Sequence, residues 1–253
     1  MSSSASTFQT KQESDREKHV RQDFRDLFDN IAISTEDKLD NLGLFINRQA
    51  WGKFLFMHQL YQHIVNVHGV VMEFGVRYGQ NLALFANFRG IYEPYNHNRR
   101  IIGFDTFTGF PSVHEKDGHH RLVHEGAYAV GEDHQNTLER ILRYHENECP
   151  ISHMQKFELI KGDATKTLDT YLDDHPETII ALAYFDFDIY APTRHCLERI
   201  RPHLVKGSVL GFDELNHPPF PGETMAVAEV LGLPNLRLQR LPYSPTTSFV
   251  IVE

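Results

Sequence analysis

The 253-residue sequence has only two cysteines and no apolar run of about eighteen residues, the length a membrane-spanning helix requires. Cys149 and Cys196 lie far apart and lack zinc-ligand spacing, so we expect two reduced thiols. The first residues form no apolar signal segment. These absences predict a soluble cytoplasmic protein with no membrane partner.

Clustered positive charge is also absent. The 25 Lys and Arg residues are scattered, and they are outnumbered by 34 Asp and Glu, for a formal net charge of −9. Nucleic-acid binding requires a concentrated basic surface, so no nucleic-acid partner is expected. The glycine fingerprint G-x-G-x-x-G is missing, as is a Tyr followed four residues later by Lys, which argues against an NAD-dependent dehydrogenase.

The sequence is organised in three parts. Residues 1–16 are polar and aperiodic, which predicts a disordered tail. Residues 17–68 contain apolar residues at helical spacing over 19–31, from about 34, and over 47–67, which predicts a helical cap whose apolar faces indicate a homodimer. Residues 69–253 alternate between strand and helix patterns and form a single globular unit with the cap.

The alternating part predicts an α/β fold, a three-layer doubly wound (Rossmann-like) sheet. Two short β runs at its end, 236–241 and 248–252, predict a terminal antiparallel hairpin. The polar connection 106–131 is too long for a simple loop and is a candidate lid or substrate-binding element. The remaining expected strands are 70–74, 100–104, 157–161, 179–185 and 208–212, and the expected helices are 81–92, 133–146, 168–173, 192–204 and 222–231.

Acids end two of these apolar strands. Asp186 and Asp188 close the run 179–185, and Asp213 with Glu214 closes the next. Ligands bind beyond the carboxyl ends of strands in open α/β sheets, so the four acids should share one rim. Carboxylates so placed repel one another unless a cation or proton compensates, which predicts a metal site and a general base. The alternative is that some of them cap the helices that follow.

The other strand ends carry further polar signals. Glu73 and Gly75 lie where the first strand turns into a helix, a place where backbone can approach a ligand closely. Asp105 ends the second strand, where a ribose is held in doubly wound folds, and Asp163 follows the third. A turn or an N-cap is the alternative for each acid.

Five segments together resemble the macrocin O-methyltransferase family of S-adenosylmethionine-dependent enzymes, which methylate sugar hydroxyls. They are Glu-Phe-Gly-Val-Arg-Tyr-Gly (73–79), Gly-Phe-Asp-Thr-Phe-Thr-Gly-Phe-Pro (103–111), Leu-Ile-Lys-Gly-Asp-Ala (159–164), Phe-Asp-Phe-Asp-Ile-Tyr-Ala-Pro-Thr (185–193) and Gly-Phe-Asp-Glu (211–214). The resemblance implies a class I methyltransferase fold with S-adenosyl-L-methionine as cofactor, Mg²⁺ as metal, and a sugar or glycosylated natural product as hydroxyl acceptor.

The resemblance also implies roles for individual residues. Glu73, Gly75 and Asn81 would lie near the methionine half of the cofactor. Asp105 and Thr106 would hold its ribose, and Asp163 with Ala164 would flank its adenine. Asp186, Asp213 and Glu214 would bind Mg²⁺, and Asp188 would be the general base. Two residues depart from the family pattern: Phe187 replaces the usual Gly between the paired acids, where it would crowd the site or re-aim Asp188, and Glu214 replaces an Asp.

Two other functions remain open from the sequence. Asp186-Phe-Asp188 is also a D-x-D, which could bind Mg²⁺ and the diphosphate of a nucleotide sugar in a glycosyltransferase. A non-catalytic binding protein could keep the fold without the chemistry.

Overall fold

The computed structural model describes residues 14–253, and the chain divides into two compact units, the first ending at Gly52 and the second running Lys53–Glu253. The first unit contains α1 (Asp15–Asn30), α2 (Thr35–Asp40) and the 3-10 turn η1 (Leu42–Leu44). Helix α1 starts with a capping box between Ser14 and Glu17. Residues 14–16, which the sequence assigned to the tail, are therefore the N-cap and first residues of a helix, and residues 1–13 of that tail lie outside the described residues.

Helix α1 shows the amphipathic pattern that its sequence predicts, but none of its residues is buried. Its large apolar side chains Val20, Phe24, Leu27 and Phe28 are all exposed by more than a third. Within this unit, Phe28 contacts Phe45 edge to face, at 4.9 Å between ring centroids. These exposed apolar side chains form a stripe along the helix.

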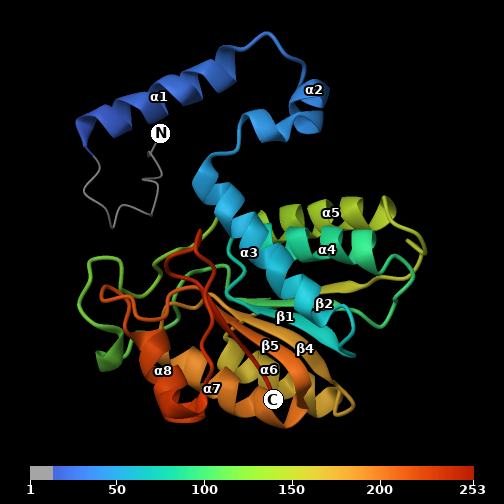
Figure 1. The fold of residues 1–253 in the computed structure, drawn as a ribbon, viewed down its shortest axis with the longest axis vertical. Coiled ribbons are helices and arrows are strands. Elements are labelled where there is room, and N and C mark those ends of the chain that lie inside the picture. The colour runs from blue at the N-terminus through green and yellow to red at the C-terminus, as the bar shows by residue number, and fades with distance from the viewer. Residues whose placement is uncertain (1–13) are drawn as a thin grey trace. The chain divides into compact units, whose positions relative to one another are not determined.

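The second unit is built on a six-stranded sheet in the order β3-β2-β1-β4-β5-β6 (Figure 1). Strands β1 to β5 are parallel, and β6 is antiparallel to β5. The strand order reverses between β1 and β4, which is where doubly wound folds bind their ligands. The strands are β1 (Val70–Phe74), β2 (Ile101–Asp105), β3 (Phe157–Lys161), β4 (Ile180–Phe185), β5 (Leu204–Phe212) and β6 (Ser248–Ile251).

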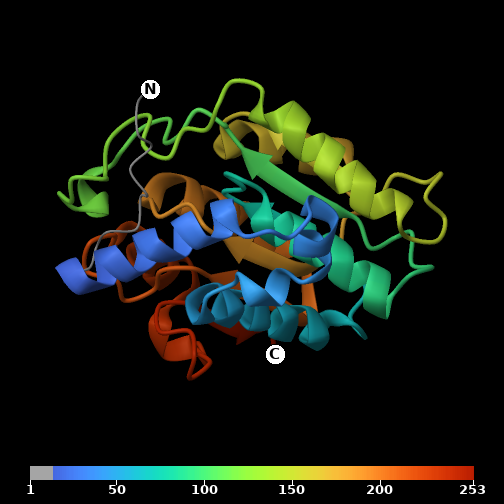
Figure 2. The same ribbon diagram turned by 90° about the horizontal axis from the view of Figure 1, so that it is seen from above.

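Helices cover both faces of the sheet, so the predicted three-layer fold is confirmed (Figures 1 and 2). Strand β4 shows why, because all six of its residues are buried and, from Leu182 on, successive side chains enter opposite cores. Leu182 and Tyr184 join the core under α3–α5, and Ala183 and Phe185 join the core under α6–α8. The helices are α3 (Arg48–Ile64), α4 (Gln80–Tyr92), α5 (His134–Asn147), α6 (Ala164–Asp174), α7 (Tyr190–Ile200) and α8 (Gly222–Leu231).

Helix α3 packs on the sheet through its second half. Phe56, Met57 and Leu60 are fully buried, whereas Trp51 and Leu55 are exposed by 43% and 45%. Gly211 of β5 makes room for this helix, because a Cβ there would lie 2.9 Å from a methyl group of Leu60.

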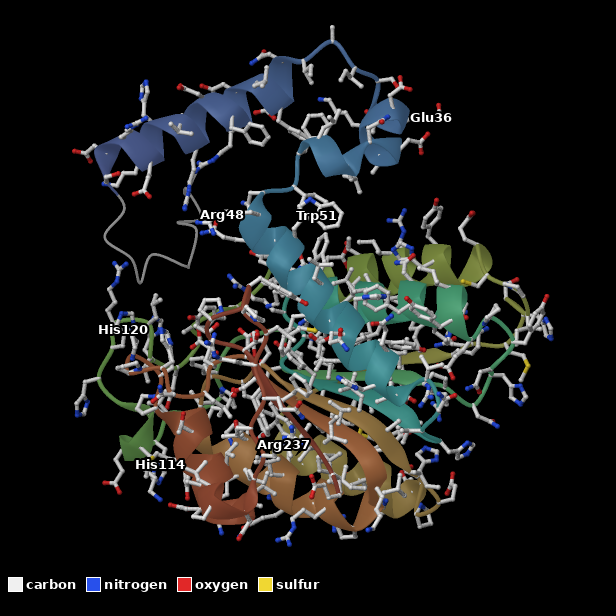
Figure 3. The ribbon with its side chains drawn as sticks, in the orientation of Figure 1. Glu36, Arg48, Trp51, His114, His120 and Arg237 are labelled. Carbon is white, nitrogen blue, oxygen red and sulfur yellow. The ribbon has the colours of Figure 1, made fainter. Side chains whose placement is uncertain are left out.

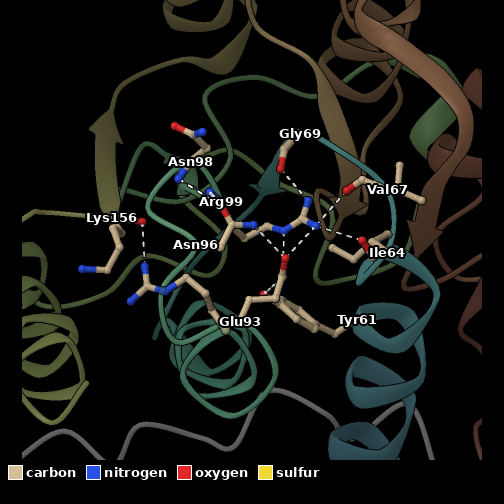
Figure 4. Close-up of polar contacts among 10 residues, drawn as sticks. Tyr61, Ile64, Val67, Gly69, Glu93, Asn96, Asn98, Arg99 and Lys156 are labelled. Atoms are coloured by element: carbon tan, nitrogen blue, oxygen red, sulfur yellow. Dashed lines mark hydrogen bonds and ion pairs between the residues drawn. The ribbon is translucent and has the colours of Figure 1, made fainter. Parts of the chain in front are cut away.

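A buried arginine fixes the end of α3. The guanidinium of Arg99 forms an ion pair with Glu93 at 2.9 Å, and Tyr61 of α3 donates to the same carboxylate at 2.7 Å (Figure 4). The remaining guanidinium N–H groups donate to three backbone carbonyls at the end of α3 and just before β1. These acceptors are Ile64 at 2.9 Å, Val67 at 2.8 Å and Gly69 at 2.5 Å.

The C-terminal strands pair differently from the predicted hairpin. The antiparallel partner of β6 is β5, with Gly211 opposite Phe249. The segment 236–241 contributes one bridge, between Gln239 and Phe249, on the other edge of β6. The antiparallel terminus is present, but the first of its two expected runs pairs at one residue only and does not form a full strand. Within residues 14–253, no helix is both long and apolar enough to cross a membrane.

Candidate functional site

Backbone hydrogen bonds continue the sheet past the ends of the parallel strands and keep these ends in register. This row of strand ends brings the sequence-predicted acids to one rim, as expected for parallel strands. The bonds run from Gly162 N to Asp105 O (2.9 Å), from Gly75 N to Phe104 O (3.0 Å), from Asp186 N to Phe74 O (2.8 Å) and from Asp213 N to Phe185 O (3.1 Å).

Gly75 lets the first loop approach the fourth. Its φ is +90°, and a Cβ at this position would lie 2.1 Å from the carbonyl oxygen of Asp186. No other residue fits both the conformation and the space. Gly75 therefore sets the close approach between the loop after β1 and the acids after β4.

Glu73 and Asn81 form a buried polar pair beside that loop. Asn81 donates to Glu73 Oε1 at 2.8 Å, and both side chains are almost fully buried. Glu73 Oε2 and Asn81 Oδ1 have no hydrogen-bond partner among the described residues. Burial, followed by the charge of Asp186, raises the pKa of Glu73 well above its usual value. Two unsatisfied buried acceptors side by side suit an ammonium group, which the methionine part of S-adenosylmethionine carries.

Asp105 is largely engaged by the protein's own backbone. Its Oδ2 accepts from Val76 N and Arg77 N, each at 2.7 Å, and its Oδ1 accepts from Phe107 N at 2.5 Å. A carboxylate offers about four acceptor positions, so a ribose hydroxyl would find about one left. Thr106 closes a turn by donating to Gly109 O at 2.6 Å. Both residues thus shape the loops around the expected ribose position.

Asp163 caps a helix, which is the alternative that its sequence position left open. Its Oδ1 accepts from Thr165 N at 3.0 Å and from Thr165 Oγ1 at 2.8 Å, at the start of α6. Ala164 is the first residue of that helix and is buried in the core beneath it.

The acids after β4 and β5 surround a lysine that sequence reasoning missed. Lys53 Nζ lies 3.6 Å from Asp186 Oδ2 and 3.4 Å from Asp213 Oδ1. Lys53 stands one turn before the buried residues Phe56 and Met57 of α3, so it projects from the same side of the helix toward the sheet rim. A polar residue at helical spacing from a core face was the available signal.

The negative charge in this cluster exceeds what one lysine can balance. Burial and the neighbouring Asp213 raise the pKa of Asp186 to about 7, even though Lys53 opposes the shift. Burial, Asp213 and Asp186 raise the pKa of Glu214 to about 8. Burial alone would lower the pKa of Lys53, but Asp213, Asp186 and Glu73 raise it above its usual value. The rim is therefore poised to take up a further cation or a proton.

Asp188 stands in a left-handed backbone conformation, with φ +62°. Burial and the charge of Glu214 raise its pKa well above the usual range. Phe187 does not crowd the acids, because its side chain packs in the opposite core, 5.9 Å from the ring of Phe74. Crowding by Phe187 is therefore absent, because the alternation of side chains past the end of β4 turns its ring away, and the other expected effect, a re-aimed Asp188, stays a prediction.

A further acid, Glu223, was also missed. It lies in the first turn of α8, is fully buried, and its Oε1 accepts from Glu214 N at 3.4 Å. Its Oε2 has no partner within residues 14–253. Burial and the nearby Asp213 and Asp186 raise its pKa well above the usual value. His217 Nδ1 lies 3.1 Å from Glu214 Oε2 and so supports the same cluster.

None of the four rim acids caps the helix that follows it. Neither α7 nor α8 has a side-chain cap from its own N-cap residue, Ile189 or Pro221. The first amide of α7, Tyr190 N, is instead satisfied by Asp117 Oδ1 at 2.6 Å. Helix capping is thus not the role of these four acids.

The segment 106–131 is anchored to the site. Asp117 is 1% exposed, and besides Tyr190 it accepts from His114 N at 2.6 Å. Two histidines of this segment contact its surroundings: His114 packs on Tyr190 of α7, and His120 packs on Phe220 in the loop before α8 (Figure 3). At its far end, Tyr128 stacks under the guanidinium of Arg77, 4.9 Å from the ring centroid. Phe107 belongs to the core, so Tyr128 is the aromatic of this segment that faces the acids, whose charges add to burial in raising its pKa.

The donor set suits a hard divalent cation, since its members are carboxylate oxygens with uncompensated charge. Among the described residues, however, no three His, Cys, Asp or Glu side chains converge on one point that could hold an ion. The position between Asp186 and Asp213 is taken by the Lys53 ammonium. The carboxylate ligands that Mg²⁺ prefers are therefore present, but they are not arranged as a preformed coordination shell.

The chain is similar to solved methyltransferase structures. A crystal structure of CalS11, a calicheamicin methyltransferase, has 44% identity, covers 94% of this chain and 93% of that one, and superposes with a TM-score of 0.91. An apo structure of CalS11, described as a TDP-rhamnose 3'-O-methyltransferase, has 41% identity over 94% and 95% of the two chains, with a TM-score of 0.83. The O-methyltransferase NovP shares the fold, with 19% identity over 79% of each chain and a TM-score of 0.61. No family model and no curated protein matches the sequence.

Proposed function

Because the chain belongs to the macrocin O-methyltransferase family and is an S-adenosylmethionine-dependent O-methyltransferase, we propose that its acceptor is a hydroxyl of a nucleoside-diphosphate-linked deoxysugar. The observation that carries the proposal is the similarity to CalS11 over nearly the whole of both chains, since CalS11 is described as acting on TDP-rhamnose. The glycosyltransferase and binding-protein interpretations of the acids are thereby set aside. A free sugar and a completed glycoside are the competing acceptors.

The cofactor would be held at the ends of β1, β2 and β3. Glu73 Oε2 and Asn81 Oδ1 would accept from the ammonium of its methionine part, which supplies the partners that these buried atoms lack. Asp105 would use its remaining acceptor position for a ribose hydroxyl, and the Asp163–Ala164 turn would lie along the adenine. Gly75, which has no side chain, would leave room at the loop for the cofactor, so that its sulfonium could face the acids.

Methyl transfer is an in-line displacement. The acceptor oxygen forms a bond to the methyl carbon while the carbon–sulfur bond breaks, and the electron pair of that bond stays on sulfur as a neutral thioether. Holding the two reactants in line can supply much of the rate enhancement. The acceptor would therefore lie between the cofactor loop at Gly75 and the acids after β4.

Asp188 would take the proton of the acceptor hydroxyl. The pKa of its carboxyl is raised by burial and by Glu214, which makes the ionised form a stronger base. The left-handed backbone at Asp188 sets the direction of the side chain, and Tyr190, two residues on, is pinned by Asp117. The hydrogen bond from Tyr190 N to Asp117 would thus hold the turn that carries the base.

We also propose that Asp186, Asp213 and Glu214 hold Mg²⁺. The support is their hard oxygen donors and the excess of negative charge around them. When bound, the ion would orient the acceptor and lower the pKa of its hydroxyl.

A homodimer is proposed from the first unit. The apolar stripe Val20–Phe24–Leu27–Phe28 is exposed along α1, and a stripe of this width on a capped helix is typical of a covered surface. A second copy of the chain would cover it. Sedimentation of the wild type and of a Phe24→Ser, Leu27→Ser variant would test this.

Calorimetry tests the acceptor class. With S-adenosylhomocysteine bound, the protein should bind TDP-rhamnose at least about tenfold more tightly than free rhamnose, because the nucleotide adds binding surface. Equal or weaker binding of the nucleotide sugar would contradict this acceptor class.

A further inference from the structure

Lys53 is the one lysine of the described chain that forms ion pairs with the acids after β4 and β5. Its Nζ lies between Asp186 Oδ2 and Asp213 Oδ1, at 3.6 and 3.4 Å. Asp213 Oδ1 is held in place from its other side, because the buried hydroxyl of Tyr184 donates to it at 2.5 Å. The ammonium therefore lies between two carboxylates that the proposed function assigns to a metal ion.

Two cations cannot share that position without strong repulsion. A Mg²⁺ ion bound to these oxygens would lie about 2.1 Å from each. Nζ is itself within 4 Å of both oxygens, so the two positive charges would be close neighbours in a poorly solvated site. Either the lysine leaves when the ion enters, or the ion stays out.

Lys53 has the means to leave. Its side chain is 31% exposed, so a path to solvent exists, and its four-carbon stem is flexible. Helix α3 itself is anchored by the fully buried Phe56, Met57 and Leu60 one and two turns further on. The side chain can thus move without moving the helix.

We propose that Lys53 is a resident counter-cation that competes with a divalent metal ion for Asp186 and Asp213. With the lysine in place, the acids are partly neutralised, and the protein folds without an ion. When the lysine swings out, the same carboxylates are free to bind the metal. This inference rests on the proposed metal face, but not on the identity of the acceptor.

The test uses the full-length protein without cofactor and Mn²⁺ alone as the probe, with free Mn²⁺ measured by electron paramagnetic resonance. Lys53→Met removes the charge and keeps most of the apolar stem. It should bind Mn²⁺ at least about tenfold more tightly than the wild type, because no ion pair has to be broken first. Lys53→Arg keeps a cation and should stay within about twofold of the wild type. Lys206→Met, at an exposed lysine of β5, is the matched control and should do the same.

A second readout covers the possibility that the variant is unstable. In EDTA the midpoint of thermal unfolding of Lys53→Met should fall below that of the wild type, and added Mn²⁺ should raise it by more than it raises the wild type. Adding Asp213→Asn to Lys53→Met should remove this Mn²⁺ effect.

Competition is overturned if Lys53→Met binds Mn²⁺ no better than the wild type, including the case in which neither binds. Because no cofactor or acceptor is present, this result is independent of methyl transfer. A protein that transfers methyl groups but shows no gain in Mn²⁺ binding would disprove the inference alone. If Lys53→Met gains Mn²⁺ binding but the wild-type protein transfers no methyl group, the proposed function is disproved and the inference stands.

Discussion

Asp117 Oδ1 accepts a hydrogen bond from Tyr190 N at 2.6 Å, although the two residues are 73 positions apart in the chain. The bond caps α7 from outside, because the N-cap residue of that helix has no side-chain acceptor of its own. It also joins the segment 106–131 to the turn that carries Asp188. Gly222 allows the approach, since a Cβ there would lie 2.2 Å from the same oxygen.

Asp117→Ala should therefore impair both folding and turnover. The buried N–H of Tyr190 and the partly buried N–H of His114 would lose their acceptor, which should lower the free energy of unfolding by about 2–5 kcal/mol. Loss of the brace behind Asp188 should lower kcat by about tenfold or more and change the KM for S-adenosylmethionine little. Urea unfolding and steady-state kinetics measure the two effects.

Two further variants separate positioning from general damage. Asp117→Asn keeps one carbonyl acceptor and should fall between the wild type and the alanine variant in both measurements. Glu115→Ala, an exposed position of the same segment, should match the wild type. Equal kcat in Asp117→Ala and the wild type would show that the brace is structural only.

Glu73→Gln should weaken cofactor binding. The substitution keeps the size of the side chain but removes the negative charge beside the unpaired Asn81 Oδ1. A hydrogen bond between charged groups contributes about 1.5–3 kcal/mol, so the Kd for S-adenosylmethionine should rise by about tenfold to a hundredfold. Isothermal titration measures it, with Glu158→Gln at the edge strand β3 as the matched control. An unchanged Kd would remove Glu73 from the cofactor site.

Asp188→Asn should abolish turnover while leaving the Kd for S-adenosylmethionine within about twofold of the wild type, because general-base catalysis contributes about a hundredfold or more. Asp174→Asn, an exposed acid at the end of α6, is the control. Turnover of Asp188→Asn at the wild-type rate would assign proton removal to another group, and Glu223 would then be the next candidate.

The strand ends and the fold could be predicted because each signal is local. A buried apolar run that stops at an acid needs no knowledge of distant residues, so Asp186 and Asp213 were placed on the right rim. The position of Gly75 was predicted in the same way, because it lies where the first strand turns into a helix. The three-layer order followed from alternating patterns, and the expected α8 has the bounds 222–231 that the structure shows.

The remaining site residues depend on contacts between distant segments. Lys53 and Asp117 lie far along the chain from the acids and the amide they contact, and nothing near either residue indicates its partner. Phe187 was misjudged because the family pattern suggested crowding, whereas the alternation after β4 sends its ring toward Phe74. Local bonds likewise give Asp163 a capping role that sequence could offer only as an alternative.

Acid should weaken the anchor of α3. Burial would raise the pKa of Glu93, but hydrogen bonds from Arg99, Tyr61 and Asn96 lower it below its usual value of 4.5. A folded-state pKa below the unfolded one stabilises the protein above the unfolded pKa, and this contribution is lost as the pH falls through the folded pKa. Wild-type stability should therefore drop more steeply below about pH 4.5 than that of Glu93→Gln.

The midpoint of urea unfolding should be measured for both proteins at a series of pH values from about 3 to about 7, which covers the range over which carboxyl groups titrate. At neutral pH the variant should be the less stable of the two, because Arg99 loses its ion pair while staying buried. Parallel pH profiles of the two proteins would mean that Glu93 is not a source of the acid sensitivity.

The central claim is methyl transfer from S-adenosylmethionine to a hydroxyl of a nucleotide-linked deoxysugar. Its most direct test is mass spectrometry of TDP-rhamnose incubated with the protein and S-adenosylmethionine, with free rhamnose as the parallel acceptor and Asp188→Asn as the inactive control. The account predicts that TDP-rhamnose gains the mass of one methylene group, with an equal amount of S-adenosylhomocysteine, and that free rhamnose gains it far more slowly. Methylation of free rhamnose at the same rate, or no methylation of TDP-rhamnose by a protein that binds the cofactor, would contradict it.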